Sequence, residues 1–108
     1  MPADIFKHIA KGKFFLIAGP CVIESEKLCL TVAEMVSQIC SEHRLPYIFK
    51  SSYLKANRLS AKSYSGPGLE KGLKTLAKVK KEFGGPILTD VHETTEIDRV
   101  SEVADILQ

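Results

Sequence analysis

Residues 14–20 read Phe-Phe-Leu-Ile-Ala-Gly-Pro, a continuous apolar run that ends abruptly at Gly19-Pro20. A short apolar run without polar alternation is typical of a strand in a parallel sheet, where helices cover both faces. The Gly-Pro pair marks the point at which such a strand stops. We therefore predict that residues 14–18 form a strand buried on both faces.

A helix is predicted after this strand, because apolar residues recur at helical spacing from Ser25, a residue type that favours the N-cap position. The predicted apolar face consists of Leu28, Val32, Met35, Val36 and Ile39. Cys29 and Cys40 fall on or near the same face, and we interpret them as packing residues.

Strand patterns return three more times along the chain. Residues 47–49 form a short β-prone run after Pro46, residues 86–90 form another, and residues 104–108 resemble the start of a fourth strand. Residues 53–68 lack any periodicity, which predicts a loop.

Two further helices are predicted between these strands. Leucines at helical spacing from Leu69 indicate the first, and Gly84-Gly85 ends it in the manner usual for a helix C-terminus. Thr94 or Thr95 is expected to cap the second.

The resulting order is β-α-β-α-β-α-β, without the Asn-Gly or Asp-Gly signals of a tight hairpin. Parallel strands joined by right-handed crossovers are the simplest solution, and both a (β/α)8 barrel and an open doubly wound sheet fit this α/β order. No linker divides the sequence, so we expect residues 1–108 to form a single domain or part of one.

Composition excludes several classes of protein. The chain has 108 residues, of which 44% are hydrophobic and 26% charged, and its net charge of +2 gives no electrostatic reason to expect nucleic acid. We expect no membrane span and no secretory signal at the N-terminus. Three widely spaced cysteines do not suggest a disulfide framework, and we expect a reducing, cytoplasmic location.

Polar side chains follow each of the first three predicted strands. They are Cys21 and Glu24 after the first, Lys50, Ser51 and Ser52 after the second, and Asp90, His92 and Glu93 after the third. Because the carboxyl ends of parallel strands form one face, where α/β proteins bind ligands, we expect a functional site there.

The segment just beyond Lys50 carries Lys55, Asn57 and Arg58. Lysine and arginine side chains next to hydroxyls and an amide suit a phosphorylated or carboxylated ligand, although a solvated loop is the alternative for lysines in general. Lys50 differs, because a cation at the end of a buried strand needs an anion. A later group of lysines is expected to be solvated only: Lys71, Lys74, Lys78, Lys80 and Lys81.

Cys21 has two open interpretations. A lone cysteine is most often a small packing residue, whereas its position at a strand end among polar groups favours a thiolate metal ligand. His92 and Glu93 are adjacent in sequence, so their side chains should diverge and they are not an obvious metal pair.

Five segments together resemble the 3-deoxy-D-manno-octulosonate 8-phosphate (KDO8P) synthases of the DAHP/KDO8P synthase superfamily. They are residues 16–25, 49–52, 55–58, 66–69 and 88–93, and the likeness extends over nearly the whole chain from about residue 14. The Lys-Ala-Asn-Arg stretch at 55–58 is the most discriminating, since the DAHP synthases usually have Lys-Pro-Arg-Thr there.

The resemblance implies the first three βα units and a fourth strand of a (β/α)8 TIM barrel, in a cytoplasmic homotetramer. It implies a condensation of phosphoenolpyruvate with arabinose 5-phosphate for lipopolysaccharide biosynthesis. By the same resemblance, Lys50, Ser52 and Lys55 would hold phosphoenolpyruvate. Asn57 and Arg58 would engage arabinose 5-phosphate, and Asp90 would line the pocket near the aldehyde. Lys55, Asn57 and Asp90 are the candidate catalytic residues.

Cys21 resembles the metal-dependent branch of the family, in which a cysteine stands where the other branch has asparagine. The resemblance therefore implies a divalent metal such as zinc, iron or manganese. The remaining ligands of that branch, a histidine, a glutamate and an aspartate, would come from later strands.

The length of the sequence limits these expectations. A (β/α)8 barrel takes roughly 250 residues, so we expect a fragment or a truncated gene, with little synthase activity in the isolated chain. Leu54, Leu59 and Ser65 also depart from the residues usual in the family. Two alternatives are a DAHP synthase that uses erythrose 4-phosphate and a non-catalytic half-barrel that serves as an interaction module.

Overall fold

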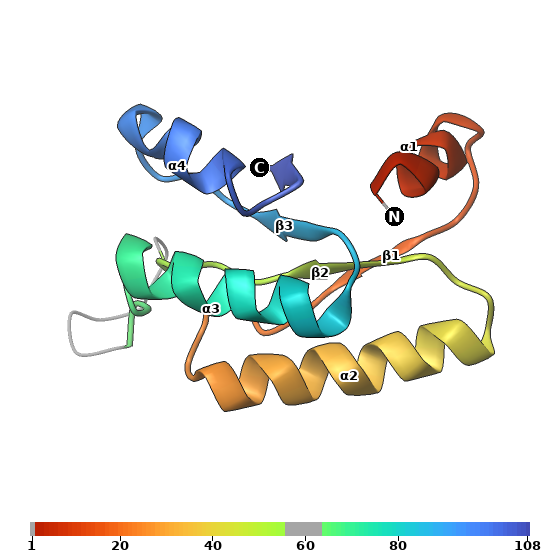
Figure 1. Cartoon of the computed structure of the whole chain (residues 1–108), viewed down its shortest axis with the longest axis horizontal. Helices are drawn as coiled ribbons and strands as arrows, with labels where there is room; N and C mark the ends of the chain where they lie inside the picture. Colours follow the sequence, from red (N-terminus) through yellow and green to blue (C-terminus); the bar gives the residue numbers. More distant parts are fainter. Residues whose placement is uncertain (1, 56–63) are drawn as a thin grey trace.

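The computed structural model describes residues 2–55 and 64–108 (Figure 1). The elements in chain order are α1 (Pro2–Ala10), β1 (Leu16–Ala18), α2 (Glu26–Glu42), β2 (Tyr47–Lys50), α3 (Leu69–Phe83), β3 (Ile87–Thr89), the 3-10 helix η1 (Thr94–Glu96), α4 (Ile97–Ser101) and β4 (Ile106–Leu107). The predicted alternation of strands and helices is confirmed. Helix α1 was not predicted.

The four strands form one parallel sheet in the order β1-β2-β3-β4. The register places Ile17 beside Ile48, and it places Lys50, Leu88 and Ile106 in one row. Strands that follow one another without a reversal are arranged as in a (β/α)8 barrel, whereas a doubly wound sheet changes direction at a switch point. The fold is therefore the first part of a barrel.

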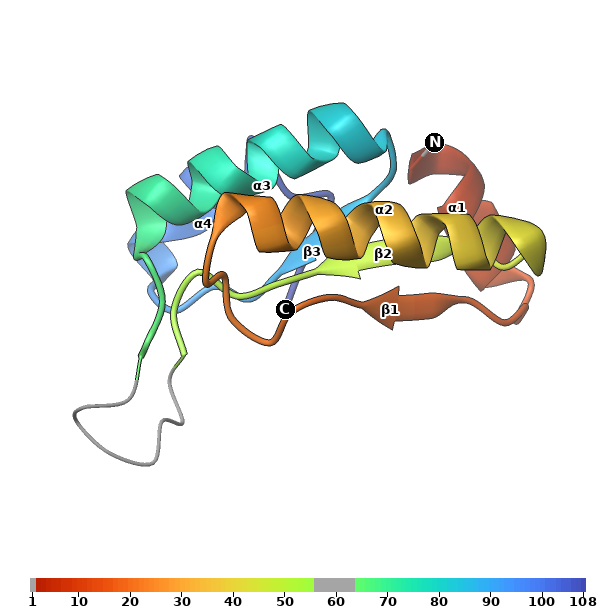
Figure 2. The ribbon, with the colours of Figure 1, turned by 90° about the horizontal axis from the view of Figure 1, so that it is seen from below.

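Each face of the sheet has its own apolar cluster. On the outer face, Phe49 and Ile87 pack with buried residues of α2, α3 and α4, and Figures 1 and 2 show α2 and α3 side by side. On the inner face, Ile48 and Leu88 pack against Ile5 of α1. Helix α1 thus covers apolar positions that alternate with those facing the other helices.

The first strand is shorter and more exposed than predicted. Only residues 16–18 pair as β1, Phe14 is 78% exposed, and Ile17 is 42% exposed. Ile17 lies on the inner face beside Ile48, but α1 packs on Ile48 and Leu88 instead. The prediction of a strand buried on both faces is therefore wrong for β1.

Helix α2 begins as predicted but buries a different face. The Ser25 hydroxyl accepts a hydrogen bond from the Leu28 N–H at 3.0 Å, which confirms the N-cap. Met35 and Ile39 are 59% and 53% exposed. The buried positions of this helix are Cys29, Ala33 and Cys40. Small residues at helical spacing allow the helix to approach its neighbours closely, so the packing role expected for the two cysteines is confirmed.

The C-terminus of α3 matches the prediction, whereas the start of the next helical segment does not. Gly84 adopts a left-handed conformation (φ +76°) and its N–H bonds to the Lys80 carbonyl, as predicted for the end of α3. The expected cap at Thr94 or Thr95 is wrong, because that turn begins as η1 and neither it nor α4 has a side-chain cap.

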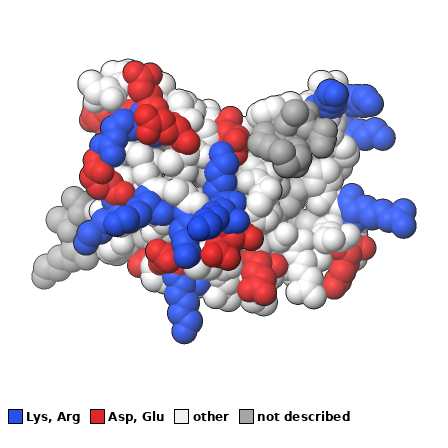
Figure 3. Space-filling view, in the orientation of Figure 1, with Lys and Arg blue, Asp and Glu red and all other residues white. Residues whose placement is uncertain are grey.

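Basic side chains gather over α3 (Figure 3). Lys71, Lys74, Lys78 and Lys81 are exposed, as predicted. Lys80 differs, because its Nζ donates hydrogen bonds to the Val103 carbonyl at 3.0 Å and to Asp105 at 3.1 Å. In the described part of the chain, no helix has the length and apolar character needed to cross a membrane.

Candidate active site

The carboxyl ends of β1, β2 and β3 lie at one edge of the sheet, as their parallel pairing requires. Lys50 pairs with Leu88, and strand alternation puts Asp90 on the same face as these two residues. Lys50 and Asp90 are both half-buried. The structure thus places an ammonium group and a carboxylate at neighbouring positions of the inner face.

Gly19 explains how Cys21 comes close to this edge. A Cβ at Gly19 would lie 1.8 Å from the Lys50 carbonyl oxygen, so only glycine lets the chain after β1 pass the end of β2. The Ser52 N–H then donates to the Cys21 carbonyl at 3.3 Å, and Val22 pairs with Ser52. Cys21 is exposed beside these residues.

The two adjacent serines have different surroundings. Ser51 is fully buried, and its hydroxyl donates to the Pro20 carbonyl at 2.6 Å. The Ser51 carbonyl accepts a hydrogen bond from the Thr89 hydroxyl at 2.8 Å. Ser51 therefore ties the ends of three strands together, while Ser52 alternates onto the face of Lys50.

Asp90 is paired with His92, the histidine that the sequence also placed at this strand end. The Asp90 Oδ2 and His92 Nε2 atoms lie 3.0 Å apart, although the contact does not have hydrogen-bond geometry. The second carboxylate oxygen, Oδ1, is buried without a hydrogen-bond partner among the described residues. The sequence had placed both residues at the end of the third strand, and their i, i+2 spacing is compatible with this contact.

Tyr53 and Glu96 also reach this site and were missed from the sequence. The Tyr53 hydroxyl donates to Glu96 Oε1 at 2.6 Å and accepts from the His92 N–H at 3.2 Å. The Tyr53 and His92 rings meet edge to face, with their centroids 5.1 Å apart. Burial, together with the bond to Glu96, raises the pKa of Tyr53 to about 12. The hydroxyl therefore remains protonated at neutral pH.

The predicted ligand-binding loop is described only in part. Lys55 is half-buried, and its backbone N–H donates to the Ser65 carbonyl at 2.6 Å. Asn57 and Arg58, and with them Leu59, lie outside the described residues.

Cys21 is the residue predicted to bind a metal ion at this edge. Within residues 2–55 and 64–108, no three histidine, cysteine, aspartate or glutamate side chains come together in a way that could hold a metal ion. Cys21 stands as a single candidate ligand, and the described residues do not form a complete metal site.

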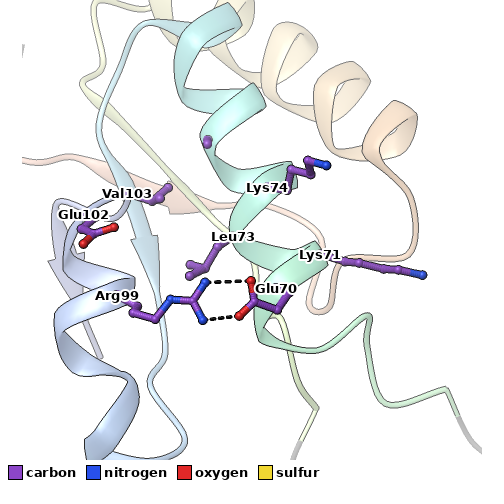
Figure 4. Close-up of a pocket in the computed structure, with 8 residues that line it drawn as sticks. Glu70, Lys71, Leu73, Lys74, Arg99, Glu102 and Val103 are labelled. Atoms are coloured by element: carbon purple, nitrogen blue, oxygen red, sulfur yellow. Dashed lines mark hydrogen bonds and ion pairs between the residues drawn. The ribbon is translucent and has the colours of Figure 1, made fainter.

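A pocket of about 420 Å³ lies elsewhere, between α3 and α4 on the outer side of the sheet (Figure 4). Arg99 of α4 reaches Glu70 of α3, and its Nη2 donates to Glu70 Oε2 at 2.7 Å. Hydrogen bonding to Arg99 lowers the pKa of Glu70. Leu73 and Val103 also line the pocket. It is lined by residues of and near the helices on the outer face, not by the inner-face residues Lys50 and Asp90, and is not the candidate active site.

Comparison with known proteins agrees with this geometry. The model of the DAHP synthetase I family matches residues 3–108. The chain belongs to the DAHP synthetase I family. This membership confirms the resemblance found in the sequence, and it accounts for the sequential parallel strands as part of a (β/α)8 barrel.

Several relatives of this DAHP synthetase I family member are named 2-dehydro-3-deoxyphosphooctonate aldolase. The protein from Legionella pneumophila (strain Corby) is 58% identical over 94 residues, which cover 87% of this chain and 34% of the relative. Those from Polaromonas naphthalenivorans and Dichelobacter nodosus are each 59% identical over 95 residues, which cover 88% of this chain and 33% and 34% of the relatives. The chain therefore spans about a third of the length of these curated relatives.

Proposed function

We propose that this chain supplies the first three βα units and the fourth strand of a KDO8P synthase. The observation that carries the proposal is the placement of Lys50 and Asp90 on one face of the sheet, at the carboxyl edge where barrel enzymes bind substrates. The relatives named 2-dehydro-3-deoxyphosphooctonate aldolase support the choice of reaction. As a KDO8P synthase, the whole enzyme would join phosphoenolpyruvate and arabinose 5-phosphate and release phosphate.

The two substrates are assigned to two groups of residues. Lys50, Ser52 and Lys55 would bind phosphoenolpyruvate, because two ammonium groups and a hydroxyl suit its carboxylate and phosphate. Asn57 and Arg58 would engage arabinose 5-phosphate, with the arginine at the phosphate. Carbon 3 of phosphoenolpyruvate would attack the aldehyde, water would add at carbon 2, and phosphate would leave by C–O cleavage.

Asp90 would face the reacting aldehyde. A half-buried carboxylate beside an imidazole can accept a hydrogen bond from a substrate hydroxyl. The close contact between Asp90 Oδ2 and His92 Nε2 would limit how the carboxylate turns.

Cys21 would contribute one thiolate to a divalent metal ion such as zinc, iron or manganese. A metal ion at this edge would orient or polarise the aldehyde as a Lewis acid. Its other ligands would come from later strands. We also propose that the whole protein is a cytoplasmic homotetramer, which rests on the resemblance alone.

A chimera tests the proposed activity. The segment of the Legionella pneumophila relative that matches this chain would be replaced by the corresponding residues of this chain. Phosphate release from phosphoenolpyruvate would then be measured with arabinose 5-phosphate and with erythrose 4-phosphate. We expect turnover with arabinose 5-phosphate, and we expect Lys50→Met and Asp90→Asn each to reduce it by about a hundredfold or more. Lys71→Met is the matched control, because Lys71 is exposed on α3.

The other outcomes separate the alternatives. A chimera that prefers erythrose 4-phosphate would indicate a DAHP synthase. A chimera that folds with the circular dichroism and thermal stability of its parent, but turns over neither aldose phosphate, would favour the non-catalytic half-barrel.

A further inference from the structure

Tyr53 lies at the junction of the two chain segments that carry the candidate site residues. It follows Ser52 at the end of β2 and is only 1% exposed. Its hydroxyl reaches across to the segment after β3, where it bonds to the His92 N–H and the Glu96 carboxylate. A single side chain thus joins the segment of Lys50 and Lys55 to the segment of Asp90.

The backbone of Tyr53 is equally constrained. Its carbonyl accepts a hydrogen bond from the Gly68 N–H at 3.0 Å, next to the bond between the Lys55 N–H and the Ser65 carbonyl. These two bonds hold Tyr53 next to Gly68 and Lys55 next to Ser65. The contacts that fix the backbone of Tyr53 therefore also restrain the position of Lys55.

Two glycines leave room for this residue. A Cβ at Gly66, whose φ is +110°, would lie 2.5 Å from the Tyr53 carbonyl oxygen, and a Cβ at Gly72 would lie 2.3 Å from the Tyr53 Cβ. Both contacts are far below van der Waals separation. The Gly-Pro-Gly stretch and the first turn of α3 are therefore shaped around Tyr53, which has little freedom to move.

Packing alone does not require a hydroxyl at this place. A buried phenol costs free energy unless its oxygen finds partners, and a phenylalanine would fill the same volume without that cost. The Tyr53 hydroxyl has two partners, and both belong to the segment after β3. The hydroxyl therefore fixes that segment relative to β2.

We propose that Tyr53 is a positioning residue, whose hydroxyl sets the location of the Asp90–His92 pair relative to Lys50 and Lys55. This inference rests on the proposed function in that Asp90 and the lysines act on the same substrates. Tyr53 itself would touch neither substrate. Its hydroxyl acts through the His92 backbone, and its ring acts through the His92 imidazole, which contacts Asp90.

The first part of the test uses the 108-residue chain and does not depend on activity. Amide hydrogen exchange would be followed by NMR in Tyr53→Phe and in the matched control Tyr47→Phe. Tyr47 is also buried, and its hydroxyl donates to the Ala18 carbonyl at 2.8 Å, on the outer side of the sheet. Tyr53→Phe should speed exchange of the His92 amide by about tenfold or more relative to the Tyr47→Phe chain.

The second part uses the chimera described above. Tyr53→Phe should lower kcat by about ten- to a hundredfold, because small misplacements of catalytic groups have effects of this size. The KM for phosphoenolpyruvate should change less than about threefold, since Lys50 and Ser52 remain on β2 and beside it. Glu96→Gln, which keeps an acceptor for the hydroxyl, should retain activity, whereas Glu96→Ala should reproduce the loss. Tyr47→Phe should leave kcat unchanged.

The outcomes are distinguishable from failure of the proposed function. An active chimera whose kcat survives Tyr53→Phe would overturn the positioning role, and so would an unchanged His92 exchange rate. If the chimera with Tyr53 intact is inactive, the proposed function fails. The exchange measurement then decides whether Tyr53 holds the His92 segment: faster exchange supports that role, and unchanged exchange overturns it.

Discussion

Lys80 and Asp105 join the last turns of α3 to the residue that precedes β4, with the Nζ and Oδ1 atoms 3.1 Å apart. Asp105 Oδ2 accepts a second hydrogen bond from the Ile87 N–H at 3.0 Å, and Lys80 also donates to the Val103 carbonyl at 3.0 Å. The Asp105 N–H in turn donates to the Ile87 carbonyl at 2.9 Å. These contacts bind α3, β3 and β4 to one another at the amino end of the strands.

Asp105→Ala should lower the free energy of unfolding by about 2 kcal/mol, because it leaves the Ile87 N–H and the Lys80 ammonium without their charged acceptor. Urea unfolding followed by circular dichroism measures the change. The exposed pair of Lys78 and Glu82, at 3.6 Å, provides the control, and Lys78→Met should cost less than about 0.5 kcal/mol. Equal costs for the two variants would contradict the structural role of Asp105.

The order of the elements could be predicted from the sequence, because strand and helix patterns differ in period and Gly84 and Pro46 mark clear boundaries. The buried face of α2 could not. Met35 and Ile39 are more apolar than Ala33, yet the closely packed side carries the small residues Ala33 and Cys40. Hydrophobic periodicity identifies the helix face with the larger apolar side chains, whereas close helix packing favours small side chains.

The candidate site, like the fold, could be predicted from the sequence only in part. Lys50, Ser52 and Asp90 could be placed at one edge from strand direction alone. Tyr53 and Glu96 could not, because they lie 43 residues apart and meet only through tertiary packing. Helix α1 escaped prediction since its inner-face partners, Ile48 and Leu88, belong to strands far along the chain.

Gly72 tests the close packing of α3 against Tyr53. An alanine in the interior of a helix normally stabilises it by about 1 kcal/mol relative to glycine. Here the added methyl group would lie 2.3 Å from the Tyr53 Cβ. Gly72→Ala should therefore lower the free energy of unfolding by about 1–3 kcal/mol, as measured by urea unfolding.

A second glycine separates steric from conformational effects. Gly84 has φ +76°, and a Cβ there would meet no atom within 4 Å, so Gly84→Ala should cost about 1 kcal/mol through backbone strain alone. A second substitution that opens space next to position 72 should therefore restore the stability of Gly72→Ala but not that of Gly84→Ala. A Gly72→Ala protein more stable than the parent would show that Tyr53 is free to shift.

Stability should fall at alkaline pH, partly because of Tyr53. Burial raises the pKa of Tyr53 from 10.0 to about 12, so the folded state holds this proton more tightly than the unfolded state does. The contribution is fully present below pH 10 and is lost as the pH rises toward 12, with a slope of at most about 1.4 kcal/mol per pH unit. Burial raises the pKa of the Cys29 and Cys40 thiols as well, which adds to the fall above pH 9.

Urea midpoints measured from pH 8 to pH 11.5 test this dependence. Tyr53→Phe should make the curve flatter between pH 10 and pH 11.5, whatever its stability at neutral pH. Gly84→Ala serves as a destabilised control that keeps Tyr53 and should retain the slope of the parent chain. Parallel curves for Tyr53→Phe and the parent would show that Tyr53 titrates alike in the folded and unfolded states.

Adjacent serines at the end of β2 allow a structural role to be separated from a binding role. Ser51 is fully buried and donates to the Pro20 carbonyl, so Ser51→Ala should lower the free energy of unfolding by about 1 kcal/mol. It should leave the KM for phosphoenolpyruvate in the chimera unchanged. Ser52→Ala should do the opposite, raising that KM by about tenfold while costing little stability, because one hydrogen bond to an anionic ligand has that magnitude. Thermal unfolding and initial rates on the same two preparations give both quantities. If Ser51→Ala raised the KM as much as Ser52→Ala, the hydroxyl of Ser51 would have to face the ligand, and the assignment of the two serines to opposite faces of β2 would be wrong.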